Sequence, residues 1–105
     1  FYKLLMYVVF SLLNSKVDTE VKSVLGRADV VIKTKNDIYV LELKVDDSVD
    51  NALAQIDSKG YAIPYEADGR AITKCGVTIS SEARNIVHWR AVDNEGKVID
   101  EQKYE

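Results

Sequence analysis

The feature that most constrains the fold is a pair of β-rich runs, residues 28–33 and 38–45, separated by the polar residues 34–37. Branched and aromatic residues on either side of a polar turn predict a β-hairpin. The second run is apolar on both faces, which is typical of a strand in the middle of a covered sheet. A chain of 105 residues can build one such sheet with its helices, and it is too short for two independent cores.

The rest of the chain predicts an α/β fold in which a mixed sheet is flanked by helices. Apolar residues repeat at helical spacing after Ser48, through Ile63, and Pro64 marks the latest point at which that helix can end. The predicted order is α-β-β-β-α-β-β-β. Its elements are a helix at 1–13, a strand at 17–25, the two hairpin strands, a helix from Asp47 or Ser48, and strands at 72–79, 86–92 and 97–99.

Composition and charge exclude several classes of protein. The chain is 47% hydrophobic and 30% charged, so it is neither disordered nor of low complexity. Its net charge of −3 provides no bulk basic field, and nucleic-acid binding would need a local patch or a metal ion that offsets acidic groups. The single cysteine, Cys75, excludes an intrachain disulfide framework and favours a reducing, cytoplasmic location.

The N-terminal apolar run is shorter than the ~20 residues that a membrane span requires. We therefore expect a buried helix there and no membrane association. Because the chain begins at Phe1, we expect residues 1–105 to be a single domain at the C-terminal end of a longer protein.

Two charged residues mark the end of the predicted central strand. Glu42 and Lys44 are two positions apart, so both side chains point to the same face of the sheet. Burying either charge without a partner is costly. The simple interpretation is a salt bridge near the edge of the sheet.

The hairpin register suggests a second interpretation. With a two- or four-residue turn, the numbers of paired residues sum to 71, and Asp29 then lies opposite Glu42 with the Cβ atoms ~5 Å apart. Two carboxylates at that distance repel by about 3 kcal/mol at an effective dielectric constant of 20. A shared proton or a hard cation such as Mg²⁺ or Mn²⁺ would relieve the repulsion. Lys44 would then hold a water molecule or stabilise charge on a phosphate.

These residues resemble the D…E-x-K core of the PD-(D/E)XK nuclease superfamily. More narrowly, residues 26–89 are similar to the nuclease-like domain at the C-terminus of bacterial AAA-ATPase-like proteins. The matching stretches are Gly26-Arg27-Ala28-Asp29, Val40-Leu41-Glu42-Leu43-Lys44, Ala52-Leu53-Ala54-Gln55-Ile56 with Lys59-Gly60-Tyr61, and Arg84-Asn85-Ile86 with Trp89.

The resemblance implies a restriction-endonuclease-like fold and a metal-dependent nuclease. Asp29 and Glu42 would bind Mg²⁺ or Mn²⁺, together with the backbone carbonyl of Leu43. Lys44 would be the catalytic lysine, and Gln55 would border the active site. The implied partners are nucleic acid, expected to be DNA, and an N-terminal AAA-ATPase-like domain of the same chain.

Two residues are additional candidates. Members of the family often carry another acid on the first helix, but residues 1–13 contain none, and Glu20 is the candidate to replace it. Arg27 would contact a phosphate or pair with an acid. The missing helix acid and the lack of a basic patch leave open an alternative function, a catalytically inactive nuclease-like domain that serves interaction beside an ATPase-like domain.

Several other residues have competing interpretations. His88 has no ligand cluster near it in the sequence, which favours a packing or surface role. Tyr61 and Tyr65 either stack on bases or pack on the sheet with the hydroxyl group in water. The acids at 46, 47 and 50 are interpreted as charges favoured at the start of a helix, and the alternative is that they deepen the cation site.

Overall fold

A computed structural model describes residues 30–104 of the chain. The described elements are β1 (Val30–Lys33), β2 (Asp37–Val45), α2 (Val49–Ser58), the 3₁₀ helix η1 (Ile63–Asp68), β3 (Ala71–Ser80), β4 (Asn85–Asp93) and β5 (Val98–Lys103). The helix predicted at 1–13 and the strand predicted at 17–25 lie outside this range, as do the first two residues of the strand predicted at 28–33.

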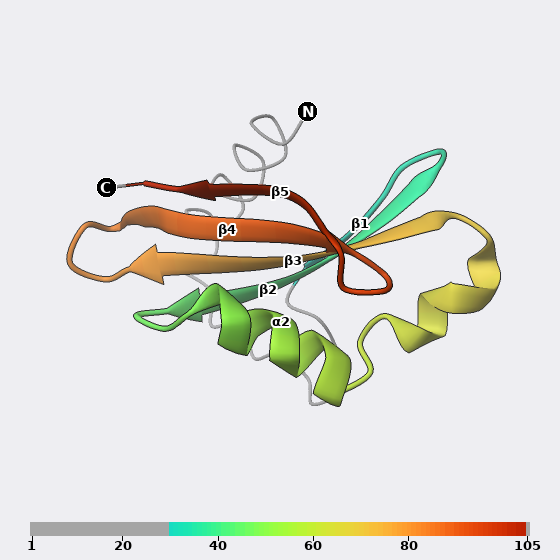
Figure 1. Cartoon of the computed structure of the whole chain (residues 1–105), viewed down its shortest axis with the longest axis horizontal. Helices are drawn as coiled ribbons and strands as arrows, with labels where there is room; N and C mark the ends of the chain where they lie inside the picture. Colours follow the sequence, from blue (N-terminus) through green and yellow to red (C-terminus); the bar gives the residue numbers. More distant parts are fainter. Residues whose placement is uncertain (1–29, 105) are drawn as a thin grey trace.

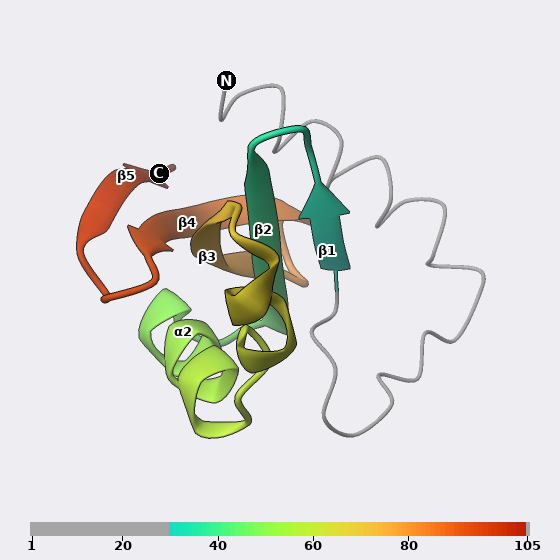
Figure 2. The same cartoon turned by 90° about the vertical axis from the view of Figure 1, so that its right-hand side faces the viewer.

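The five strands form one mixed sheet in the order β1-β2-β3-β4-β5. Strands β2 and β3 are parallel and the other neighbouring pairs are antiparallel. The parallel pair is joined by a crossover that contains α2 and η1, and both helices lie on the same side of the sheet (Figures 1 and 2). The prediction that 38–45 is an interior strand is confirmed, because β2 has a neighbour on each side.

The hairpin has the predicted register wherever it is described. Val30 pairs with Leu41 and Lys33 pairs with Ile38, so the paired numbers sum to 71. Thr34 closes the turn: its backbone N–H donates to the carbonyl of Asp37 at 2.8 Å, and its hydroxyl accepts from the N–H of Asp37 at 3.1 Å. Local turn chemistry therefore sets which side chains of β2 share a face.

The start of α2 agrees with the sequence, but its end does not. Ser48 is the N-cap, and its side chain accepts a hydrogen bond from the N–H of Asn51 at 3.0 Å. The helix ends at Ser58, because Gly60 adopts φ +64°, a left-handed conformation that a helix interior does not allow. Ile63, predicted to continue the apolar face, is 64% exposed.

The predicted element order also lacked η1, which begins directly before Pro64. A proline near the first position costs a helix no hydrogen bond, so this residue starts a new short helix after the previous one has ended. At the other end of the sheet, β5 extends to Lys103, well beyond the predicted 97–99. All six of its residues are exposed, so it shows no alternation of buried and exposed positions.

Apolar side chains form a cluster on each face of the sheet. The cluster on the face covered by α2 contains Ile38, Val40, Ile56, Tyr61, Ala62 and Ile72. The cluster on the other face contains Tyr39, Leu41, Cys75, Val77, Ile86, Trp89 and Ala91. The first contains residues of α2 and of the segment that follows it, so burial of this face holds the helix against β2 and β3.

No helix in the described part of the chain is long and apolar enough to cross a membrane.

Candidate functional site

Glu42 and Lys44 lie near the end of β2, on the face that α2 covers. Glu42 is 4% exposed, and its neighbour across the parallel pair is Gly76. Lys44 lies one pleat further along, opposite Thr78, and is partly buried. Two opposite charges thus lie side by side at the inner edge of the helix–sheet interface.

Gln55 of α2 joins these two charges. Its side-chain Nε2 donates to Glu42 Oε1 at 2.8 Å, and its Oε1 accepts a hydrogen bond from Lys44 Nζ. The Lys44 Nζ to Glu42 Oε1 distance is 3.9 Å, at the outer limit of an ion pair. The amide therefore bridges a carboxylate and an ammonium group whose direct ion pair is weak.

Tyr61 orients the bridging amide from the far side. Its hydroxyl accepts from Gln55 Nε2 at 3.1 Å, and its ring is buried in the cluster beneath α2. The predicted packing of this tyrosine is confirmed, and burial excludes base stacking by its ring. Tyr65 is partly buried, and Lys33 Nζ lies 5.3 Å from the centroid of its ring.

Gly76 explains how α2 approaches the sheet closely enough for these contacts. A Cβ at this position would lie 2.9 Å from the carbonyl oxygen of Val49 and 3.1 Å from side-chain atoms of Ala52 and Leu53. Backbone and helix core thus occupy the space that a side chain would need. The glycine opposite Glu42 allows Gln55 to reach across β2.

The acids that follow β2 are engaged in local contacts. Hydrogen bonds from Ser81 lower the pKa of Asp46. A hydrogen bond from the Asn51 side chain and one from the Ser48 backbone lower the pKa of Asp47. Asp46 bonds to the backbone N–H of Ser81 at 2.9 Å, which ties the end of β2 to the β3–β4 turn. Asp47 thus lies at the start of α2, as predicted for this acidic segment, whereas Asp46 contacts the β3–β4 turn.

The remaining predicted site residues are distributed as follows. Asp29, Arg27 and Glu20 lie outside the described residues. Leu43 lies between Glu42 and Lys44 on β2, and its side chain packs against the apolar cluster of the opposite face.

The donor set of the described residues fits a hard cation only in part. Glu42 presents a carboxylate, a ligand that Mg²⁺ and Mn²⁺ prefer. Within residues 30–104, no group of three or more His, Cys, Asp or Glu side chains is placed to hold a metal ion. A complete oxygen site at Glu42 would therefore need ligands beyond the side chains of residues 30–104.

A second polar group was missed by reasoning from the sequence. His88 and Arg90 of β4 both contact Glu101 of β5, and Arg90 also contacts Asp50 in the first turn of α2. His88 is partly buried on β4, in keeping with its interpretation as a packing or surface residue, and its ion pair with Glu101 is what the sequence did not indicate. Its partner lies thirteen residues away, and only the pairing of β4 with β5 brings the two together.

Comparisons with known proteins agree with this architecture. A family model described as the PD-(D/E)XK nuclease superfamily matches residues 1–89. The chain is 33% identical over 89 residues to an uncharacterized protein in the vnfD 5′ region of Azotobacter chroococcum mcd 1, a match that covers 83% of this chain and 17% of that protein. The chain thus spans less than a fifth of that relative's length. No solved structure matches it. The chain belongs to the PD-(D/E)XK nuclease superfamily.

Proposed function

We propose that this member of the PD-(D/E)XK nuclease superfamily is a metal-dependent nuclease that hydrolyses phosphodiester bonds of nucleic acid, with DNA as the expected substrate. The observation that carries the proposal is the hydrogen-bonded set of Glu42, Gln55 and Lys44 at the end of a buried strand. A buried carboxylate beside an oriented ammonium group is an arrangement suited to phosphoryl chemistry.

In this proposal Asp29 and Glu42 are the metal ligands, assisted by the carbonyl of Leu43. Extending the observed hairpin register by one residue would pair Asp29 with Glu42, which supports the assignment. Mg²⁺ or Mn²⁺ bound there would supply Lewis-acid activation of a water molecule and of the phosphate.

Lys44 is the proposed catalytic lysine, because its ammonium group carries the positive charge next to the buried carboxylate. Gln55 keeps that group directed along β2 by accepting its hydrogen bond. In the presence of substrate, Lys44 would stabilise negative charge that develops on the phosphate or hold the attacking water. Arg27 and Glu20 are proposed as additional contributors, to phosphate binding and to the acidic set respectively.

The decisive measurement is calorimetric titration with Mn²⁺ of the wild type and of the Asp29→Asn and Glu42→Gln variants. Both substitutions keep the side-chain shape and remove the charge that a hard cation requires. We expect binding to the wild type and its loss in both variants. Asp100→Asn, the same change on the exposed strand β5, is the matched control and should bind as the wild type does.

Lys44→Ala separates metal binding from catalysis. This variant should keep its Mn²⁺ affinity within a few-fold and lose cleavage of a labelled DNA substrate, because the lysine acts on the phosphate in this proposal. Cleavage at the wild-type rate would contradict the role of Lys44. Metal binding unaffected by Asp29→Asn and Glu42→Gln would contradict the metal site.

A second candidate is a nuclease-like domain that has no catalysis and serves interaction. The net charge of −3 favours it, because this charge opposes binding of a polyanion. An N-terminal AAA-ATPase-like domain in the same chain is the proposed partner for either function, supported by the resemblance of residues 26–89 to such C-terminal domains. Failure to bind Mn²⁺ in the presence of oligonucleotide would favour this second candidate.

A further inference from the structure

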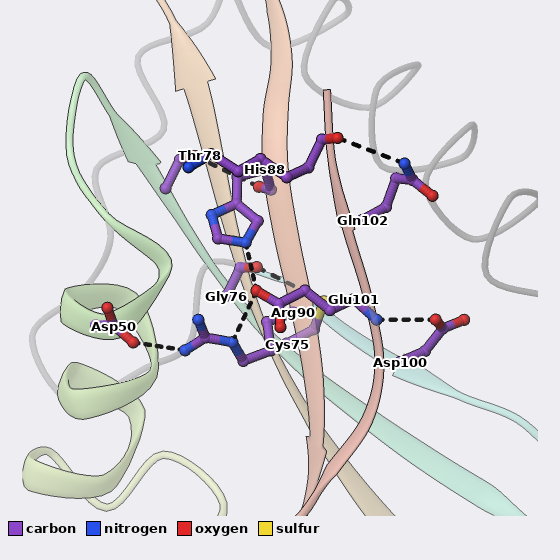
Figure 3. Close-up of polar contacts among 10 residues, drawn as sticks. Asp50, Cys75, Gly76, Thr78, His88, Arg90, Asp100, Glu101 and Gln102 are labelled. Carbon is purple, nitrogen blue, oxygen red and sulfur yellow. Dashed lines mark hydrogen bonds and ion pairs between the residues drawn. The ribbon is translucent and has the colours of Figure 1, made fainter. Parts of the chain in front are cut away.

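A second polar cluster lies on the α2 face of β4 and β5, and we call it the β4–β5 cluster (Figure 3). Its members are Asp50, His88, Arg90 and Glu101. His88 Nε2 lies 2.5 Å from Glu101 Oε2, and Arg90 Nε donates to the same oxygen at 3.1 Å. Two basic side chains from one strand therefore converge on a single carboxylate oxygen.

Of the two basic groups, Arg90 is held in place independently of that carboxylate. Arg90 Nη1 donates to Asp50 Oδ1 at 2.5 Å, which anchors the guanidinium group to the first turn of α2. The pKa of Arg90 is raised, first by this hydrogen bond. At His88, the backbone carbonyl accepts from the Thr78 hydroxyl at 3.4 Å. Removing the Glu101 side chain would leave the guanidinium group of Arg90 oriented by Asp50.

The Glu101 carboxylate, in contrast, lies on an exposed strand, where its side chain can turn away from the two basic groups. Strand β5 lies at the edge of the described sheet and all six of its residues are exposed. The Glu101 side chain is 35% exposed, and a rotamer change would move it into water without breaking any backbone pairing. The pKa of this carboxyl group is lowered, first by His88, so it carries its charge at neutral pH.

The β4–β5 cluster is aligned with the candidate site. Arg90 pairs with Gly76, and Gly76 in turn is the neighbour of Glu42, so the two sites share a row of the sheet, with α2 packed over the glycine between them. His88 lies in the next row, which contains Lys44 on β2. Two strand spacings separate β4 from β2, a distance of about 10 Å.

We propose that His88 and Arg90 form a phosphate-binding pair for the nucleic-acid substrate at the end of the sheet that carries Lys44, and that the Glu101 carboxylate occupies this pair until a phosphate displaces it. The proposal rests on the nuclease function and names a contact with its substrate. A carboxylate and a phosphate both accept charge-assisted hydrogen bonds from arginine and histidine, so one can take the position of the other.

The test is binding of a fluorescently labelled single-stranded DNA, measured by anisotropy in EDTA, to the wild type and to Glu101→Ala. Glu101→Ala removes the carboxylate that competes with the DNA for His88 and Arg90. Its DNA affinity should therefore be about fivefold higher, which corresponds to the free energy of one partly exposed ionic contact. The slope of log K against log salt should change little, because the same phosphate contacts the pair in both proteins once Glu101 has been displaced.

Asp100→Ala is the matched control. It removes the same charge from the adjacent residue, which is opposite Ala91 and therefore on the other face of β5. If the DNA affinity of Asp100→Ala rises equally, the change reflects the net charge of the protein, and the proposal is overturned. The double variant Glu101→Ala with Arg90→Gln should lose the gain, because one of the two donors is absent.

Further outcomes keep the test decisive. If Glu101→Ala does not fold, as judged by its thermal transition, Glu101→Gln should show a smaller gain of the same sign. Unchanged or weaker binding by the folded variant overturns the proposal. If Glu101→Ala binds inorganic phosphate more tightly than the wild type does but binds the oligonucleotide no more tightly, the assignment of the site to nucleic acid is overturned. Because EDTA removes metal ions, a negative result here is distinct from failure of the Mn²⁺ titration that tests the nuclease function.

Discussion

Gln55 shows how one side chain can organise a candidate active site. An amide presents a donor and an acceptor at once, so it satisfies a carboxylate on one side and an ammonium group on the other. It donates to Glu42 and accepts from Lys44. A carboxylate in its place would still accept from the lysine, but it could not donate to Glu42.

Gln55→Glu is therefore expected to destabilise the protein at pH 7 by about 1–3 kcal/mol, because two carboxylates would face each other where a hydrogen bond now exists. Urea unfolding measures the effect. Gln102→Glu makes the same chemical change on the exposed strand β5 and should alter stability by less than about 0.5 kcal/mol. Equal stability of the two variants would mean that the Gln55 bridge contributes little.

Cys75 is the second residue with a clear expectation. It is fully buried among apolar side chains, and burial raises the pKa of its thiol to about 12. Because the thiolate is the reactive form, a thiol reagent should modify native protein at least about 10³-fold more slowly than protein unfolded in urea. Rapid labelling of native protein would show that β3 opens locally without global unfolding.

Among the elements, the contact of α2 with the sheet depends on Gly76. The helix backbone lies where a side chain on β3 would project, and the carbonyl of Val49 is a rigid obstacle. The Ser48 cap then sets where the helix begins, and Gly60 sets where it ends. Together these positions place Gln55 above Glu42.

Gly76→Ala should cost about 1–3 kcal/mol, because the helix must move away from the sheet to make room for the methyl group. It should also weaken Mn²⁺ binding in the proposed site, since the same movement shifts Gln55. Gly69→Ala is the control: a Cβ there meets nothing within 4 Å, so only the strain of φ +93° remains. Loss of stability with unchanged Mn²⁺ affinity would separate the packing of α2 from the site.

For the molecule as a whole, Arg70 joins the crossover to the hairpin. Arg70 donates to Asp68 Oδ2 at 2.7 Å and to the carbonyl of Thr34 at 3.0 Å. It thereby connects the end of η1 with the β1–β2 turn. The hydrogen bond from Arg70 lowers the pKa of Asp68 from 3.8 to about 2.

A depressed carboxyl pKa stabilises the fold while the group is ionised. The contribution of Asp68 should therefore be fully present above about pH 4 and disappear as the pH falls toward 2. Asp68→Asn should lower the melting temperature at pH 7 and flatten its decline below pH 4. Glu66→Gln removes the same charge from η1, and the decline of its melting temperature below pH 4 should stay close to that of the wild type. Parallel curves for wild type and Asp68→Asn would contradict this contribution.

The sequence by itself determined the features that depend on neighbours in the chain. The hairpin register, the interior position of β2, the shared face of Glu42 and Lys44, and a helix start at Asp47 or Ser48 all follow from a period of two, a polar turn and a capping side chain. Each needs only a few adjacent residues, so the local pattern is sufficient. The roles assigned to Asp29, Glu42, Lys44 and Gln55 in catalysis stay predictions.

Only the tertiary structure decided which distant side chains meet. The hydroxyl of Tyr61 reaches Gln55 because the chain turns back beneath α2 after Gly60. Glu101 reaches His88 and Arg90 because β5 pairs with β4. The physical reason is that a local pattern states which face a side chain occupies, whereas its partner depends on strand order and helix placement, which the burial of the whole core selects.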